Sequence, residues 1–371
     1  FPTPLPERAI PLFVLLTAAG LALALKASRV SWPFAALLVW AFARMFLSGF
    51  YIDPISPQAG VVVMEVGRAR PAQLLVLLAF MSILYVVARE LPGRVARWAA
   101  WALVVGATWE FAFGLINAFG RYPFMAFVLP DQVGRPMGFL THPNYWGSYM
   151  ALALPVVAAL GGLLPAVAVY ALIVYTWSGG PAISASAGAL VLLWPDLSRR
   201  MRYAAIASLS AAVAVVMTVH EWRLSGRREV WAAVWPELSR YPLIGQGLGS
   251  WRVWADHYNA KLSALTGQRE IFATLQAHNE PYQLWFELGL IGVVLVGCWA
   301  AQAWLAARTA WGSCPRGNGP FWSPGRIPLE RAWIAVLATA LVNSLGSPTF
   351  HLPAQAAITL FALARVQAHA A

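Results

Sequence analysis

The sequence predicts an all-α, polytopic integral membrane protein with a large external loop containing amphipathic helices. Hydrophobic residues make up 60% of the chain and charged residues only 11%, whereas charged residues form about 25% of an ordinary soluble domain. The mean hydropathy is +0.62, which means more apolar surface than one soluble core can bury. The apolar residues also gather in runs, and we expect about 11–12 transmembrane helices from runs of roughly 17–25 residues.

The candidate spans follow one another along the whole chain. They lie near residues 9–25, 32–50, 71–88, 95–117, 143–160, 163–178, 181–195, 203–219, 281–304, 331–347 and 352–368. The span 32–50 is weakened by Arg44, and the span 181–195 is short. Gly179, Gly180 and Pro181 are turn-forming residues that can break one span in two at that point.

Lysine and arginine are distributed unequally between alternate connections. The richer set contains Lys26, Arg29, Arg89, Arg94, Arg97, Arg199, Arg200, Arg202, Arg308, Arg316, Arg326, Arg331 and Arg365. Leaving out the long loop 220–280, the poorer set contains Arg8, Arg68, Arg70, Arg121 and Arg135. Because short cytoplasmic loops are enriched in these residues, the richer set is predicted to be cytoplasmic and the loop 220–280 external.

This topology places the first residue, Phe1, outside and the last residue inside. We therefore expect a further helix before Phe1; the alternative is an eleven-span protein with an external N-terminus. The net charge of +11 then serves topology and the binding of phosphate-bearing membrane lipids. Nucleic acid is not an expected partner, because no nucleic-acid-binding motif accompanies the charge.

Cofactor and metal signatures are missing from the sequence. Its two cysteines, Cys298 and Cys314, predict neither a disulfide framework nor a cysteine metal site. The segment 245–249 contains a Gly-x-Gly, but it neither follows a strand nor opens a βαβ unit, so it predicts a tight turn and no dinucleotide site. We expect no cofactor and no metal. Glu110, inside a candidate span, is either functional or held in a structural hydrogen bond.

The first polar segment on the external face covers residues 134–144. His142 and Asn144 flank Pro143 at the predicted start of a helix, where capping and interfacial anchoring are the ordinary roles of such residues. Arg135 stands after a glycine that allows a ligand to approach the backbone. It is either an anion ligand or one partner of a structural salt bridge with the nearby Asp131.

The second segment is Ser-Gly-Arg-Arg at 225–228. Ser225 is a plausible N-cap, and apolar residues at helical spacing after it predict an amphipathic helix on the membrane surface. Arginines in a first turn face the positive end of the helix dipole, which indicates a compensating anion such as a phosphate. Arg227 is the stronger candidate for that anion. Arg228 and Arg223 have the alternative of snorkelling toward lipid headgroups.

The third segment covers residues 276–281. Asn279 or Glu280 is predicted to start the helix 281–304, which leaves His278 just outside it, beside the loop 220–280. A single histidine is commonly structural. Histidine is also the side chain best suited to accept a proton near neutral pH, so His278 is a candidate general base.

These segments, in this order, resemble the O-antigen ligase and O-antigen polymerase superfamily of bacterial membrane glycosyltransferases. They are Gly-Arg-Pro-x-Gly-x-x-x-His-Pro-Asn, Ser-Gly-Arg with a downstream Trp, Pro-Leu-Ile-Gly-Gln-Gly, and His-Asn ahead of Glu-Leu-Gly-Leu-Ile-Gly, within 134–292. The resemblance implies one transmembrane glycosyltransferase domain over 1–371, typically of twelve helices. The loop 220–280 would be periplasmic and would carry the site.

The resemblance also implies roles for residues and substrates. Arg135 and Arg227 would bind the pyrophosphate of an undecaprenyl-pyrophosphate-linked glycan, and His278 would activate the acceptor hydroxyl. Further candidate contacts are Arg228, His142, Asn144, Asn279 and Glu280. The expected activity is that of an O-antigen ligase in the bacterial inner membrane, with its active site facing the periplasm.

The expected reaction is inverting and metal-independent, with the lipid A-core oligosaccharide or another glycan as acceptor. A polymerase and a protein O-oligosaccharyltransferase use the same donor and remain alternatives. A transporter of lipid-linked glycan is the alternative from a different class.

Overall fold

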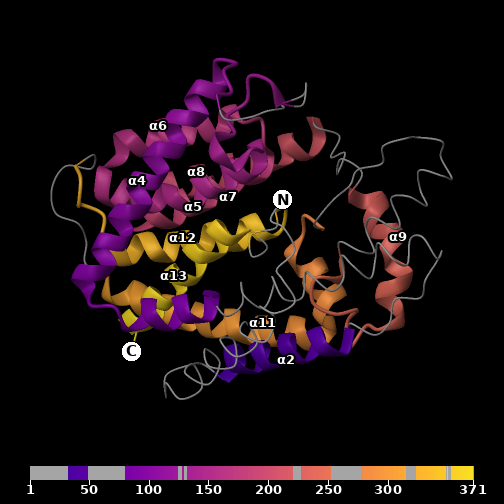
Figure 1. Ribbon diagram of the computed structural model, residues 1–371. Helices are drawn as coiled ribbons and strands as arrows, with labels where there is room; N and C mark the ends of the chain where they lie inside the picture. Colours follow the sequence, from indigo (N-terminus) through magenta and orange to yellow (C-terminus); the bar gives the residue numbers. More distant parts are fainter. Residues whose placement is uncertain are drawn as a thin grey trace. The chain divides into compact units, whose positions relative to one another are not determined.

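The computed structural model describes residues 32–48, 80–123, 128, 132–219, 227–251, 277–314, 323–347, 349 and 352–370, and every regular element in these ranges is helical (Figure 1). The predicted all-α class is therefore confirmed. The predicted span 9–25 and most of the loop 220–280 lie outside the described residues, as do Ser225, Arg223 and Asp131.

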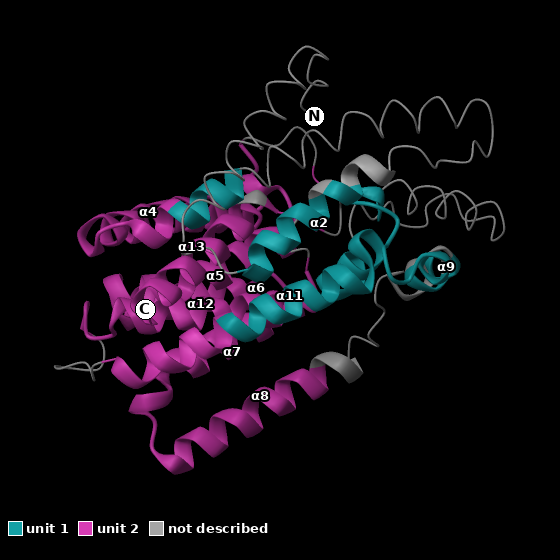
Figure 2. Ribbon diagram, turned by 90° about the horizontal axis from the view of Figure 1, so that it is seen from below, with its two compact units in different colours: residues 1–86, 223–302 teal, residues 87–222, 303–371 magenta. Residues whose placement is uncertain are grey.

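Contacts divide the chain into two compact units, each of which is described by itself (Figure 2). Unit 1 contains residues 1–86 and 223–302, and unit 2 contains residues 87–222 and 303–371. The expectation of a single functional domain over 1–371 stays a prediction.

Unit 2 is a helical bundle arranged around one central helix. Its helices are α4 (Gly93–Ala118), α5 (Pro143–Gly161), α6 (Leu163–Tyr175), α7 (Gly179–Leu193), α8 (Arg199–Val219), α12 (Leu329–Ser344) and α13 (Pro353–Ala370), with the 3-10 turns η3 (Gly138–Leu140) and η4 (Trp194–Asp196). The central helix is α5, which packs against α4, α6, α7, α12 and α13. Its long stretch of alanine, leucine and valine from Met150 to Ala159 is entirely buried.

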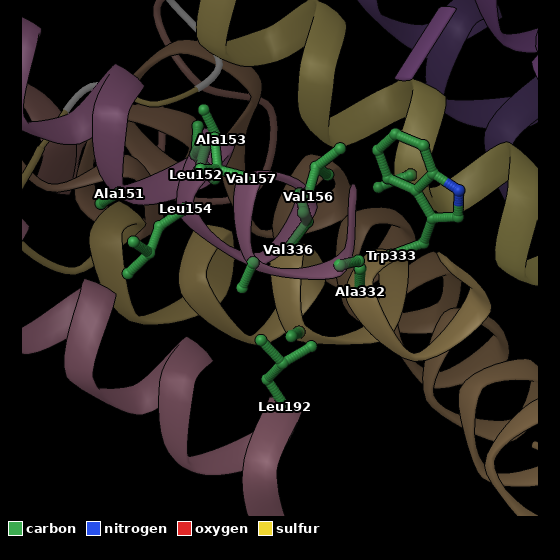
Figure 3. Packing of buried hydrophobic residues seen from close by; sticks show 14 of the residues in the cluster. Ala151, Leu152, Ala153, Leu154, Val156, Val157, Leu192, Ala332, Trp333 and Val336 are labelled. Atoms are coloured by element: carbon green, nitrogen blue, oxygen red, sulfur yellow. The ribbon is translucent and has the colours of Figure 1, made fainter. Parts of the chain in front are cut away.

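Figure 3 shows the core that α5 forms with its neighbours. Leu152 and Val156 of α5 lie with Leu192 of α7 and with Trp333 and Val336 of α12. Small residues allow these helices to approach closely. At Gly188 on α7, for example, an added Cβ would overlap the Thr339 hydroxyl of α12.

The helices of unit 2 alternate in direction, so their termini form two sets. At one end, which we call the basic end, Arg365 near the end of α13 donates to the Leu91 carbonyl just before α4 (2.7 Å). Arg331 near the start of α12 pairs there with Asp196 just after α7 (2.8 Å). The opposite end, which we call the polar end, brings together the starts of α5, α7 and α13 with the ends of α6 and α12.

The predicted helix boundaries agree with the structure to within a few residues for most of the described spans. The break predicted near Gly179–Pro181 is present, because α6 ends at Tyr175 and α7 begins at Gly179. Pro181 then lies in the first turn of α7, where a missing N–H costs no helical hydrogen bond.

Two described helices, α4 and α11 (Glu280–Ser313), are long and apolar enough to cross a membrane. Both expose large apolar side chains. Trp98 and Val105 of α4 are 69% and 67% exposed, and Trp304 of α11 is 70% exposed. Exposed apolar surface of this extent indicates an interaction face.

Unit 1 contains α2 (Trp32–Ser48), a helical segment at 80–86, α9 (Arg227–Arg240) and residues 280–302 of α11. The ring of Phe34 on α2 lies 4.8 Å from that of Tyr85 and 4.9 Å from that of Trp299 on α11. These three aromatic residues are buried and join the three helices.

Helix α11 is interrupted at Gly289, whose φ of 68° and ψ of −175° are not helical. Its peptide groups bond there to the segment 242–247, which contains the Pro-Leu-Ile-Gly-Gln-Gly motif. The four backbone hydrogen bonds are Gln246 N to Phe286 O (2.8 Å), Gly247 N to Glu287 O (2.9 Å), Leu290 N to Pro242 O (2.9 Å) and Ile291 N to Leu243 O (3.2 Å). Gly245 and Gly289 lie so close that a Cβ on either would overlap backbone atoms of the other segment.

Helix α2 completes this junction. The guanidinium of Arg44 donates to the Gly245 carbonyl at 2.7 Å, and Trp40 Nε1 donates to the Leu288 carbonyl at 2.8 Å. Arg44, which weakens the predicted span 32–50, is 7% exposed. Its buried position is consistent with the requirement that a non-helical turn inside an apolar region must have its carbonyl groups satisfied by protein donors.

We predict that Gly289→Ala destabilises the protein by at least about 2 kcal/mol, because a left-handed φ is unfavourable with a Cβ and the Leu243 carbonyl must also move. The matched control is Gly297→Ala in the same helix, where a Cβ meets no atom within 4 Å. The control should change stability by less than about 1 kcal/mol. Thermal unfolding of the purified protein in detergent, followed by tryptophan fluorescence, measures both. Equal midpoints for the two variants would contradict the importance of this junction.

Candidate functional site

The predicted site residues divide between the two units. Arg135, His142 and Asn144 belong to unit 2, whereas Arg227 and His278, with Arg228, Asn279 and Glu280, belong to unit 1. Within unit 2 the structure connects Arg135, Asn144 and His142, and within unit 1 it attaches Trp231 of α9 to the segment 277–282.

In unit 2, Arg135 follows a turn closed by its own backbone N–H, which donates to the Gln132 carbonyl at 3.1 Å. The side chain is half-buried and reaches the connection between α6 and α7. Its Nε donates to the Thr176 carbonyl at 2.8 Å, and its Nη2 donates to the Ser178 hydroxyl at 3.3 Å. These two contacts orient the guanidinium toward the connection between α6 and α7.

The same serine links Arg135 to the start of α5. Ser178 Oγ donates to Asn144 Oδ1 at 2.5 Å, and the Asn144 backbone N–H donates to Nδ1 of His142 at 3.2 Å. His142 is the N-cap of α5, as predicted, with extended backbone angles and a side chain that accepts this bond. Asn144 therefore contacts the group that holds Arg135. Substrate contact by His142 or Asn144 stays a prediction.

A set of buried polar side chains lies at the polar end of unit 2 and was missed by sequence reasoning. Ser148 Oγ donates to Asn343 Oδ1 at 3.0 Å, and Asn343 Nδ2 donates to Thr349 Oγ1 at 2.9 Å. Gln355 donates to the Tyr145 carbonyl at 3.0 Å, and its Oε1 is buried without a hydrogen-bond partner among the described residues. The available signal was the run of polar residues Asn343, Ser344, Ser347 and Thr349 at the end of an apolar helix.

In unit 1, α9 covers Arg227–Arg240 and has a buried apolar side, whereas its predicted N-cap, Ser225, lies outside the described residues. Val234 and Leu238 are buried, and Trp235 is half exposed. Trp231, one turn after Arg227, donates from Nε1 to the Ala277 carbonyl at 2.8 Å. Helix α9 is thereby attached to the residue that precedes His278. The side chains of Arg227 and Arg228 lie outside the described part of the structure.

A second contact joins α9 to the first turn of α11. The Tyr282 hydroxyl donates to the Trp231 carbonyl at 2.8 Å, and the two rings stack with centroids 5.7 Å apart. Arg227 and Trp231 are four residues apart on one face of α9, which corresponds to about 6 Å along the helix axis. The start of α9 and the His278 segment are therefore neighbours within unit 1.

His278 is half-buried and has a φ of 53°, in the left-handed region that is uncommon for residues other than glycine. The residues after it start α11 as predicted. Asn279 accepts the Tyr282 backbone N–H at its Oδ1 (2.9 Å), which is an N-cap contact, and Glu280 is buried in the first turn. Uncommon backbone angles of this kind cluster at functional sites.

A buried polar network fixes the residue before His278. The Ala277 N–H donates to Gln283 Oε1 at 2.9 Å, and Gln283 Nε2 donates to Glu287 Oε1 at 3.0 Å. The other oxygen of Glu287 accepts the Gly249 N–H at 2.9 Å. Glu287 is 2% exposed, so this network connects the Gly-rich segment to the His278 segment through the interior. Sequence reasoning gave no role to Gln283 or Glu287.

An apolar pocket of about 350 Å³ lies beside His278 in unit 1. It is lined by Trp231, Asn279, Pro281, Tyr282, Trp285, Leu290 and Val293. Three aromatic side chains and one amide in a small pocket match the usual composition of an organic ligand site, in which apolar walls give affinity and few polar groups give orientation.

Among the described residues, no group of three or more His, Cys, Asp or Glu side chains could hold a metal ion. Metal independence stays a prediction. No protein-family model matches this chain, and no curated protein matches it.

We predict that Trp231→Phe loosens α9 from the His278 segment, because phenylalanine keeps the ring and loses the donor to the Ala277 carbonyl. A lost hydrogen bond of about 0.5–1.5 kcal/mol should accelerate amide exchange in α9 by about 2–10-fold. Hydrogen exchange with mass spectrometry on the purified protein measures the exchange rate of the α9 amides. Trp235→Phe is the control, since Trp235 is 50% exposed. The attachment would be refuted if both variants exchanged at the wild-type rate.

Proposed function

We propose that the protein is a polytopic membrane glycosyltransferase of the O-antigen ligase type. It transfers a glycan from undecaprenyl pyrophosphate to the lipid A-core oligosaccharide at the periplasmic face of the bacterial inner membrane. The observation that carries the proposal is the attachment of α9, which begins at Arg227, to the strained His278 segment through Trp231 and Ala277. A candidate phosphate ligand and a candidate base are thereby neighbours.

The membrane location is supported by apolar surface and by charge. The exposed faces of α4 and α11 carry tryptophan, valine and leucine, which suit contact with lipid chains. In unit 2, Arg331 and Arg365 lie at the basic end, whereas Arg135 lies at the polar end. By the positive-inside rule the basic end is cytoplasmic, and Arg135 then faces the periplasm.

The chemistry needs a stabilised leaving group and a proton acceptor. The bond between the anomeric carbon and the pyrophosphate oxygen breaks, and the electron pair leaves with undecaprenyl pyrophosphate. Arg135 and Arg227 stabilise the charge that develops on this group, since guanidinium groups bind phosphate oxygens in a bidentate fashion. An acceptor hydroxyl attacks the opposite face of the anomeric carbon, which inverts its configuration.

His278 accepts the proton of the attacking hydroxyl. Its backbone is fixed on both sides, by the Ala277 contacts and by the Asn279 cap, so the imidazole starts from a defined position. The aromatic pocket beside it suits the apolar face of a sugar ring. General-base help of this kind contributes about 10²–10⁴-fold to a rate.

We predict that His278→Ala still binds the donor while transfer falls by about 10²–10⁴-fold, because only the proton acceptor is removed. Arg135→Ala and Arg227→Ala should weaken donor binding together with the rate. The controls are His369→Ala and Arg94→Ala, both exposed and both at the basic end of unit 2.

The measurement gives purified protein an undecaprenyl-pyrophosphate glycan with either lipid A-core, a second lipid-linked repeat or a serine peptide, and determines the product mass. A product on lipid A-core supports the ligase; a product on either other acceptor identifies a polymerase or a protein oligosaccharyltransferase. Normal glycan transfer by His278→Ala would refute the role of His278 as general base. Donor binding without any product, together with movement of the donor across vesicle membranes, identifies a transporter.

We also predict that Arg227→Lys impairs transfer nearly as much as Arg227→Ala. A lysine supplies a point charge and cannot reproduce the planar fork on a pyrophosphate. Initial rates of product formation at saturating acceptor compare the two variants. Wild-type activity in the lysine variant would reduce Arg227 to a general electrostatic attractor.

A further inference from the structure

Unit 2 contains an apolar cavity of about 600 Å³, open on one side, between α5, α6, α7 and α8, apart from the proposed transfer site. Its walls are mostly leucine and alanine side chains, among them Leu154, Leu163, Leu190, Leu193 and Leu209. Val167, which lines the cavity, is 62% exposed, so the cavity reaches the protein surface beside α6. The volume lies within the usual range for ligand sites, about 300–1,000 Å³.

The cavity is suited to hydrocarbon and not to water. The hydroxyls of Tyr170 and Ser186 at its wall bond to each other at 2.7 Å, so neither requires a water molecule. Cavities lined in this way stay dry in aqueous proteins and bind apolar molecules. A lipid acyl chain is the apolar molecule available at the surface of a membrane helix.

Positive charge adjoins the cavity. Leu197 and Ala205 line it, and between them in the sequence stand Arg199, Arg200 and Arg202 in the first turn of α8. Arg199 and Arg200 are exposed. Arg202 is half-buried; its Nε donates to the Trp194 carbonyl at 3.1 Å. It therefore holds the start of α8 against η4, at the edge of the cavity.

The nearby carboxylate of Asp196 is already engaged. The carboxylate accepts a hydrogen bond from Arg331, in the first turn of α12, at 2.8 Å. It also lies 3.5 Å from Arg326, in the loop before α12. Two guanidinium groups share this single carboxylate, so it does not neutralise the charge of Arg199 or Arg200. Arg199 Nε donates at 3.4 Å to the Tyr203 hydroxyl, which is a neutral group. The basic end of unit 2 thus has an excess of positive charge beside an apolar cavity.

We propose that this cavity holds one acyl chain of an anionic phospholipid, whose phosphate is bound by Arg199 and Arg200. Basic residues beside pockets between membrane helices bind acidic headgroups on the cytoplasmic side. The inference rests on the proposed membrane location and orientation, and it does not depend on glycosyl transfer. Arg135 lies at the opposite, polar end of the same unit, so the lipid site and the donor site are separate.

The test is native mass spectrometry of the full chain in detergent, with phosphatidylglycerol and phosphatidylcholine of identical acyl chains added separately. Wild type should retain phosphatidylglycerol in preference to phosphatidylcholine. The double variant Arg199→Gln/Arg200→Gln should weaken phosphatidylglycerol binding by about 30-fold, as each arginine near an acidic headgroup contributes roughly fivefold. The control is Arg94→Gln/Arg97→Gln, which removes the same charge from exposed positions at the same end.

A second pair of variants tests the cavity itself. Ala205→Phe fills the cavity and should weaken binding of phosphatidylglycerol, whereas Ala204→Phe, on the exposed side of α8, should not. Thermal midpoints without lipid check that both variants fold. Equal binding of the two lipids, or equal losses in the two double variants, would overturn the proposal. Glycan transfer is measured on the same samples, so an inactive wild type that still selects phosphatidylglycerol removes only the proposed transferase function.

Discussion

The backbone junction between residues 242–247 and 286–291 is the constraint on which the arrangement of unit 1 depends. Gly245 and Gly289 permit an approach that no side chain allows, and four peptide hydrogen bonds then replace those lost where α11 is interrupted. The junction lies directly after the end of α9, while Trp231 attaches the front of the same helix to Ala277. Helix α9 is therefore fixed to α11 at both of its ends, and the position of Arg227 relative to His278 follows from these two attachments.

In unit 2, Arg135 is oriented by polar groups at the ends of the helices. The helices around α5 approach through alanine and glycine, which leaves no room for long polar side chains inside the bundle. Polar groups are instead collected where the helices end, and there Arg135 is held by the Thr176 carbonyl and the Ser178 hydroxyl. These two contacts fix the direction of the guanidinium at the polar end of unit 2.

Most helices could be predicted from the sequence because each depends on a local signal. Apolar runs marked α4, α5, α6, α7, α12 and α13, and Pro143 and Asn279 marked helix starts. The interruption at Gly289 could not be predicted, since glycine is common in apolar helices and its partner, Gly245, is 44 residues away. The contacts of Arg135 with residues 176–178 depend on the same kind of long-range packing, and the sequence suggested only the adjacent Asp131.

The backbone of His278 is held in an uncommon conformation by the residues on either side of it. A left-handed conformation costs a residue with a Cβ about 1–2 kcal/mol, and glycine would adopt it without that cost. The surrounding structure enforces the conformation, because the Ala277 peptide is held by Trp231 and Gln283 while Asn279 caps α11. None of these contacts requires a histidine at position 278, since all involve its neighbours. The proposed role of His278 as proton acceptor would use this fixed backbone position, beside the aromatic pocket.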